Sequence, residues 1–466
     1  MKVLIGRTTF LMLLIMTLMT GCSHFAHYPL NAPLAKFDSG YGYTAQNLQK
    51  EGKSDELLLI LSFSGGGTRA AAFSHGVLEE LRATEVTFEG KKRRLVDEVD
   101  MISGVSGGSF TAAYFGLFGD RIFEDYETRF LKKNIQGALI TSMLFNPVNW
   151  FRLSSPYFDR SDLAAEYYDE NVFDGKTFGD MLERKGPVVL INATDMSLGA
   201  RFTFHQGLFN AMCSDLSIFP VARACAASSA VPGLLTSLTL KNYAGTCGFV
   251  VPTMIDVSSN KSYRQRDMLN NMALLMDSQK KPYFHLVDGG VADNLGLRAI
   301  EESVDAIGNI WTTMKLSGRE KVRKVAFVVV NAETKTESQW DKADIIPPLS
   351  TMISNYSTIA IVRYNRETMA LLQESFNRWA QQIRSGRCPQ GQISKEPGSC
   401  GDIEFYLVDV RFENIRDETE GNYLANLPTS FHLPPEDVDR LKAAARRILV
   451  GSDDFQKLIK DLSSQP

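Results

Sequence analysis

Continuous apolar runs of strand length, each leading into a glycine-rich turn and a helical pattern, constrain the fold of this chain most. One such run is "ELLLILSFS" (56–64), and in the segment after it Phe73, Val77 and Leu81 recur at helical spacing. A strand that is apolar at every position is typical of a sheet buried on both faces. Strands that alternate with helices are typical of α/β folds. The sequence therefore predicts an α/β fold with a mostly parallel sheet.

The same alternation continues along the chain. Further strands are predicted at 99–103, 187–195, 282–290, 324–332 and 404–412, and further helices at 292–307, 357–385 and 435–449. Residues 136–157 differ, because they combine aliphatic residues with Phe145, Trp150, Phe151 and Tyr157. One interpretation is core packing or an ordinary amphipathic insertion. The other is an acyl-chain groove or a membrane-facing cap, since Trp and Tyr suit interfaces.

The N-terminus has the features of an export signal. Lys2 and Arg7 precede an apolar run that ends in "LMTGC", and the run is too short for a permanent membrane span. This ending resembles a bacterial lipoprotein signal. We predict a signal peptide over residues 1–21 and lipidation of Cys22, whose acyl chains would anchor the protein in a membrane. No aspartate follows Cys22, which favours an outer-membrane lipoprotein of the bacterial cell envelope. The alternative is a cleaved signal with an incidental cysteine.

Export to an oxidising compartment permits disulfides among the remaining five cysteines. Cys388 and Cys400 bracket a loop rich in Pro, Gly and Ser, and they are the best candidate pair. Cys213 with Cys247 is a weaker candidate, and Cys225 is expected to be buried. No His/Cys spacing suggests a metal site. The formal net charge of −4 argues against nucleic acid as a partner.

The segment "ISGVSGGSF" (102–110) contains the pattern G-x-S-x-G around Ser106. A predicted strand precedes it and a helical pattern follows it, which is the context of a nucleophile elbow. Such a turn exposes the serine hydroxyl and places free backbone N–H groups beside it, including that of Gly107.

A serine needs a base, and the six histidines offer no clear one. Only His432 occupies the late position of a hydrolase-type final histidine. The alternative is Asp288 in "VDGGVADN" (287–294), at the end of a predicted strand. An aspartate there also suits a turn. As a base it would act only if burial raised its pKa, or if the proton moved within the transition state.

A third glycine-rich turn, "FSGGGTRAA" (63–71), connects a strand to a helix. It matches neither common phosphate-loop pattern. The backbone N–H groups of Gly65, Gly66 and Gly67 at a helix start would suit a developing oxyanion. Arg69 would support that loop, face an anionic head group or pair with a carboxylate.

"GGGTR", "GVSGG" and "DGG", in this order and each after a strand, resemble the patatin-like phospholipase family. "ARACAASSAVPGLL" (222–235) and "INATD" resemble further segments of it. The resemblance covers roughly residues 57–448. It departs at Ala70, where the family commonly has glycine. It implies a three-layer fold, with helices on both faces of the central sheet, in a catalytic domain over 55–450. A tether over 22–54 and a C-terminal tail over 451–466 complete the predicted organisation.

The resemblance also implies a Ser–Asp dyad, with Ser106 as nucleophile and Asp288 as base. Gly65, Gly66, Gly67 and Gly107 would form the oxyanion hole, with no cofactor and no metal. The predicted function is a membrane-tethered lipid acyl hydrolase of phospholipase A or lysophospholipase type. Its substrate would be a lipid or phospholipid; head group and oligomeric state stay open. The alternatives are a conventional Ser-His-Asp esterase that uses His432 and a non-catalytic lipid-binding lipoprotein.

Overall fold

The computed structural model describes residues 31–48, 52–231, 234–251, 262–334, 348–389 and 398–463, together with residues 344, 346 and 396. The predicted signal peptide and Cys22 lie outside these ranges. None of the helices within the described residues combines the length and the hydropathy needed to cross a bilayer.

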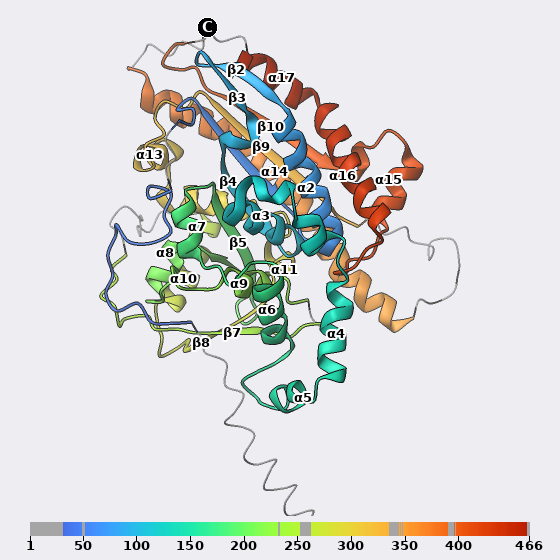
Figure 1. Cartoon of the computed structure of the whole chain (residues 1–466). Helices are drawn as coiled ribbons and strands as arrows, with labels where there is room; N and C mark the ends of the chain where they lie inside the picture. The colour runs from blue at the N-terminus through green and yellow to red at the C-terminus, as the bar shows by residue number, and fades with distance from the viewer. Residues whose placement is uncertain are drawn as a thin grey trace, which may run out of the picture.

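An eight-stranded sheet runs through the centre of the molecule (Figure 1). The strand order is β10-β9-β1-β4-β5-β8-β7, and β6 pairs with β5 off this path. The first five strands of this order are parallel, whereas β6, β7 and β8 pair antiparallel to their neighbours. The strands are β1 (Leu57–Phe63), β4 (Val99–Val105), β5 (Val188–Asp195), β6 (Ala200–Phe204), β7 (Leu238–Lys241), β8 (Tyr283–Asp288), β9 (Lys324–Asn331) and β10 (Glu404–Arg411). A separate hairpin joins β2 (Glu85–Phe88) and β3 (Lys91–Arg94).

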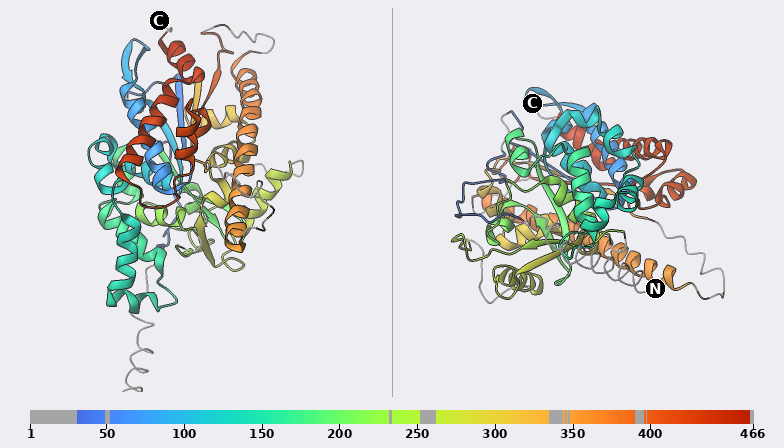
Figure 2. Two further views of the ribbon diagram at one scale, coloured as in Figure 1. Left: turned by 90° about the vertical axis from the view of Figure 1, so that its right-hand side faces the viewer. Right: turned by 60° about the horizontal axis from the view of Figure 1, so that its bottom comes forward.

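Helices cover both faces of the sheet, so the predicted α/β class and three-layer arrangement are confirmed (Figure 2, left). Alternate residues of β1 explain why both faces need a cover. Leu59 and Leu61 belong to one apolar core, and Ile60 belongs to the other. The first core includes α2 (Gly67–Ala83), α3 (Gly107–Phe118) and α16 (Pro435–Val450). The second includes α12 (Arg298–Ile307), α13 (Ile310–Leu316) and α14 (Leu349–Arg387).

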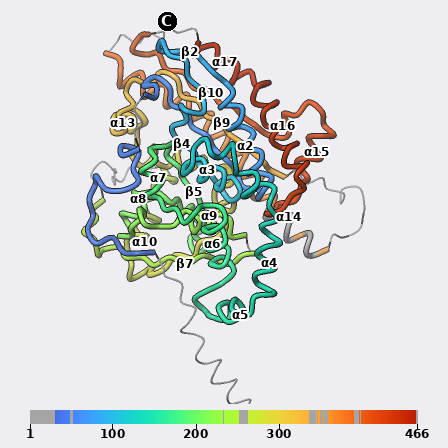
Figure 3. The backbone as a smooth tube through the Cα atoms, in the orientation of Figure 1, coloured from blue at the N-terminus to red at the C-terminus, as the bar shows by residue number. Residues whose placement is uncertain are grey.

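Further helices surround these layers. They are α4 (Ile135–Phe145), α5 (Pro147–Leu153), α6 (Arg160–Asn171), α7 (Phe178–Arg184), α8 (Gln206–Ala211), α9 (Val221–Ser228), α10 (Tyr263–Leu275), α11 (Gly290–Asp293), α15 (Glu418–Ala425) and α17 (Asp453–Ser463). Single turns occur at η2 (Leu95–Glu98), η3 (Gly119–Phe123), η4 (Glu127–Leu131) and η6 (Phe412–Asn414). In the backbone trace, α4 and α5 extend below the other described elements (Figure 3).

One predicted helix is divided in the structure. The pattern at 292–307 predicted a single helix, but α11 ends at Asp293 and α12 begins at Arg298. Gly296 adopts a left-handed conformation with φ of +71°, which interrupts the helix. The Asp293 carboxylate then accepts a hydrogen bond from the Arg298 N–H (2.9 Å). Asp293 thus satisfies a free donor in the first turn of the second helix.

Parts of the predicted tether and tail pack against the domain. Tyr43 and Leu48 are buried in the main core, and the Val189 N–H donates to the Tyr43 hydroxyl (2.8 Å). At the other end, Phe455 and Leu458 of α17 are buried in the same core. The described parts of 31–48 and 451–463 are therefore structural elements of the domain.

Candidate active site

The register of β5 brings the ends of β4 and β8 together. Asn192 pairs with Val105 of β4 and with β6, so these two strands lie on opposite edges of β5. Ala193 pairs with β6 and with Asp288, so β8 lies on the same edge as β4. The two strands run in opposite directions along β5 and end at adjacent residues of it. The turns that follow Val105 and Asp288 consequently meet.

Ser106 occupies the turn between β4 and α3 in a strained backbone conformation. Its φ and ψ are 48° and −123°, and its side chain is almost wholly buried (3% exposed). The Ser106 N–H donates to the Ser228 hydroxyl (2.8 Å), and that hydroxyl donates to the Asn192 carbonyl (2.6 Å). Ser228 therefore connects the elbow to β5. The position of Ser228 in "ARACAASSA" is its only signal in the sequence, and that position predicts no such role.

Asp288 is buried at the end of β8, beside Ser106. The Gly290 N–H donates to its Oδ1 (2.7 Å). Burial raises the pKa of the Asp288 carboxyl from 3.8 to about 6, although hydrogen bonds from Gly290 and from the Ser106 side chain lower it. Within the described residues Oδ2 has no partner of standard hydrogen-bond geometry. The contact with Ser106 therefore falls outside standard hydrogen-bond geometry.

The glycine loop after β1 lies beside the turn that carries Ser106, but the first N–H of this loop already donates a hydrogen bond. The Gly65 N–H, which we predicted in the oxyanion hole, donates to the Asn294 carbonyl (3.1 Å), so it is not free for another acceptor in this structure. Gly65 instead permits close approach, because a Cβ there would lie 2.6 Å from Asn294 Oδ1 and 3.4 Å from Ser106 Cβ. The N–H groups of Gly66 and Gly67 have no acceptor among the described residues.

The starts of α2 and α3 touch each other at Gly67 and Gly107. A Cβ on Gly107 would lie 1.9 Å from the Gly67 carbonyl oxygen, so no larger residue fits without a backbone shift. The Gly107 N–H also has no acceptor within the described ranges. Two helix N-termini thus direct unpaired N–H groups to one region next to Ser106.

Arg69 supports the glycine loop from within the protein. Its guanidinium donates to the carbonyls of Ala332 (3.0 Å) and Leu427 and to the hydroxyls of Thr334 (2.7 Å) and Thr429 (3.1 Å). Burial lowers the pKa of Arg69 to about 10. No carboxylate among the described residues forms an ion pair with it. Of the three predicted roles, these contacts fit support of the loop.

The histidine alternative has no matching geometry. His432 is exposed, and its ring forms no hydrogen bond within the described chain. His285 contacts Thr239, and His205 caps α8. Burial lowers the pKa of His205 to about 4. None of these three rings contacts Ser106 or Asp288.

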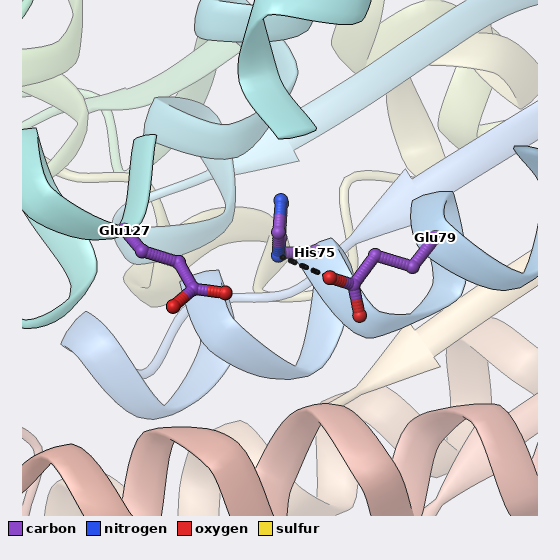
Figure 4. A group of neighbouring side chains, drawn as sticks. All are labelled: His75, Glu79 and Glu127. Carbon is purple, nitrogen blue, oxygen red and sulfur yellow. Dashed lines mark ion pairs between the residues drawn. The ribbon is translucent and has the colours of Figure 1, made fainter. Parts of the chain in front are cut away.

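His75, Glu79 and Glu127 form a group whose polar atoms lie within 4.8 Å of one another (Figure 4). His75 Nδ1 lies 3.8 Å from a Glu79 oxygen. A protein cation already contacts both carboxylates, because Lys442 Nζ lies 2.8 Å from Glu79 and also contacts Glu127. Burial and Lys442 lower the pKa of His75 to about 4. The group acts as an ion-pair network between α2 and α16.

Both candidate cysteine pairs form disulfides in the structure. Cys388 is bonded to Cys400, and Cys213 is bonded to Cys247. Cys225 is a buried free thiol. The Cys213–Cys247 bridge packs against Leu34, which fixes the segment before β1 to the domain.

The chain belongs to the patatin-like phospholipase family, whose model matches residues 61–300. No curated protein sequence matches this chain. Among solved structures, the human group IVD cytosolic phospholipase A2 is similar, with 14% identity and a TM-score of 0.43 over 90% of this chain. This chain covers 62% of the human enzyme's length. The type III effector protein ExoU matches with 13% identity and a TM-score of 0.21, over 89% of this chain and 77% of its own.

Proposed function

We propose that the protein hydrolyses a carboxylic ester of a phospholipid or lysophospholipid through a Ser106–Asp288 dyad. The observation that carries the proposal is the meeting of β4 and β8 on one edge of β5. It sets a serine in an elbow turn beside a buried carboxylate whose pKa is about 6. A base with a pKa in this range is ionised at neutral pH, and it is stronger than an ordinary aspartate.

In the first half of the reaction, Ser106 Oγ attacks the ester carbonyl and its proton passes to Asp288. The N–H groups of Gly66, Gly67 and Gly107 stabilise the oxyanion, since they have no acceptor among the described groups. The tetrahedral intermediate then loses the alcohol, which takes the proton from Asp288. In the second half, Asp288 takes a proton from water, the hydroxide attacks the acyl-enzyme, and the fatty acid leaves as Ser106 regains its proton.

Active-site labelling combined with product analysis tests the dyad. A fluorophosphonate should label Ser106, and mass spectrometry of a lipid extract should detect released fatty acid. Ser106→Ala should abolish both, whereas Ser74→Ala, at another buried serine, should retain them. His432→Asn should retain most of the rate. A loss of about 10³-fold or more in His432→Asn would indicate a triad instead. Absent labelling with intact lipid binding would favour the non-catalytic alternative.

We also propose that lipidated Cys22 anchors the protein in the bacterial outer membrane. The support is the sequence alone, a cationic start and an apolar run that ends in "LMTGC". Metabolic labelling with a palmitate analogue should mark the wild-type chain and leave Cys22→Ala unlabelled. Equal labelling of the two chains would contradict the proposal.

A further inference from the structure

The hairpin of α4 and α5, together with the turn that follows α5, exposes a group of large apolar side chains. We call this group the apolar tip; each member is between 56% and 76% exposed. It consists of Leu144, Phe145, Val148, Trp150, Phe151 and Tyr157. Soluble surfaces carry scattered apolar residues, but six such exposed side chains between residues 144 and 157 indicate a binding surface.

Polar contacts inside the hairpin hold the apolar tip in place. Asn146 caps α5 by accepting a hydrogen bond from the Val148 N–H (3.1 Å). The buried Asn149 donates to the Ser142 hydroxyl (2.9 Å), and the Trp150 indole N–H donates to the Leu144 carbonyl (3.1 Å). The aromatic surface is thus presented by a hairpin in which the side chains of Asn146, Asn149 and Trp150 are already hydrogen-bonded.

The hairpin offers almost no charge to a partner. Between residues 134 and 158, Arg152 is the only side chain that is charged at neutral pH. Arg152 forms a bidentate ion pair with Glu166, and its Cζ lies 3.9 Å from the centre of the Phe158 ring. An uncharged surface with Trp and Tyr matches the boundary between lipid head groups and acyl chains, where these residues gather.

The size of the apolar tip does not suit a second copy of the chain. A stable protein interface takes roughly 20–30 residues from each partner. The apolar tip has six side chains, on a hairpin that extends away from the rest of the molecule (Figures 1 and 2). Insertion into a lipid layer needs no matching protein surface, only apolar side chains that can leave water.

The base of the hairpin lies next to the candidate active site. Gln136, in the first turn of α4, exchanges two hydrogen bonds with Phe431 (both 3.3 Å). The neighbouring Ser430 carbonyl accepts from the Thr68 N–H (2.9 Å), directly after the glycine loop. The eleven residues of α4 span about 16 Å. An apolar tip inserted about 5–10 Å into a lipid layer would leave the glycine loop on the order of 10 Å from the lipid surface.

We propose that the apolar tip inserts into the interfacial layer of a phospholipid bilayer and holds the active site over its substrate. This contact is separate from the Cys22 anchor. The proposal of insertion rests on the proposed function in one respect, which is that phospholipid is the substrate. The hairpin then determines access to lipid in a bilayer, and the dyad determines the chemistry.

Trp150 provides a local probe of insertion in the full chain. Phosphatidylcholine vesicles with brominated acyl chains should quench its fluorescence, because bromine quenches only nearby indoles. Trp150→Phe keeps an apolar side chain and should remove most of the quenching. The N-terminal anchor is the same in both chains, so the difference reports the hairpin. Absent quenching in the wild type, or equal quenching in Trp150→Phe, would overturn the proposal.

Hydrolysis of two substrates separates interfacial binding from chemistry. Phe145→Ser with Phe151→Ser should lower hydrolysis of vesicle phospholipid by about tenfold or more and leave that of a soluble short-chain ester unchanged. Tyr263→Ser, at an exposed tyrosine outside the hairpin, should leave both rates unchanged. Equal losses on both substrates would overturn the proposal. A wild-type chain that cleaves neither substrate would contradict the proposed function, while bromolipid quenching would still test the hairpin.

Discussion

Asp288→Asn should stabilise the fold at alkaline pH while it removes hydrolysis. Burial raises the pKa of this carboxyl from 3.8 to about 6, so the native state holds its proton more tightly than the unfolded chain does. The native state therefore loses stability as pH rises from about 4 through about 6, and the loss is complete above that range. At 1.36 kcal/mol per pH unit, the buried carboxylate costs about 3 kcal/mol at pH 8.

Asparagine has the same shape and no charge, so it avoids that cost. Its oxygen can still accept the hydrogen bond from Gly290. We expect the free energy of unfolding of Asp288→Asn to exceed that of the wild type by up to about 3 kcal/mol at pH 8. This difference in the free energy of unfolding should shrink towards zero near pH 4, because in the folded wild type Asp288 is then protonated and neutral, like the asparagine. Urea unfolding at several pH values, followed by circular dichroism, measures it.

Asp293→Asn provides the matched control. Asp293 is also buried with a pKa raised to about 6, but it contacts Arg298 rather than Ser106. The free energy of unfolding of this variant should exceed that of the wild type by a margin that grows with pH, as for Asp288→Asn. Its hydrolytic rate should stay close to that of the wild type. In the wild type, kcat/KM should fall below pH 6 as Asp288 gains a proton. An Asp288→Asn chain that is less stable than the wild type at pH 8, or that still hydrolyses esters at the wild-type rate, would contradict the assigned pKa and role of Asp288.

Two further predictions concern the site's backbone and the disulfides. Gly107→Ala should lower kcat by about 10²-fold or more, because its Cβ would lie 1.9 Å from the Gly67 carbonyl and displace the donors. Gly207→Ala, whose Cβ meets only the His205 ring, should keep the rate; similar kinetics for both variants would contradict the assignment. Replacing Cys213 and Cys247 by Ser should cost about 4 kcal/mol of stability from the 34-residue separation, measured by urea unfolding, and an unchanged midpoint would contradict this estimate.

Much of the site could be predicted because its signals are local. Residues 57–61 are apolar at every position, so they predict a strand buried on both faces, and the structure contains β1 there. The glycines around Ser106 indicate a sharp turn, and the turn has a positive φ. Such features depend on residues that are close in sequence, so composition and spacing reveal them.

Other features depend on partners far away in the chain. Nothing near Gly65 indicates that its N–H pairs with Asn294, more than two hundred residues later. Nothing in "NPVNWF" indicates whether its aromatic residues are covered, because exposure depends on what else packs there. The role of Ser228 likewise depends on distant residues, since it arises from contacts with Ser106 and Asn192.

The three glycine-rich turns and the residues that they carry follow from the sequence, and the family resemblance implied that Ser106 and Asp288 act together. How their turns meet depends on tertiary contacts, because β8 runs antiparallel to β5 on the edge that β4 also uses. Periodicity identifies a strand but not its direction or its neighbour, because both depend on hydrogen bonds to residues far away in the sequence.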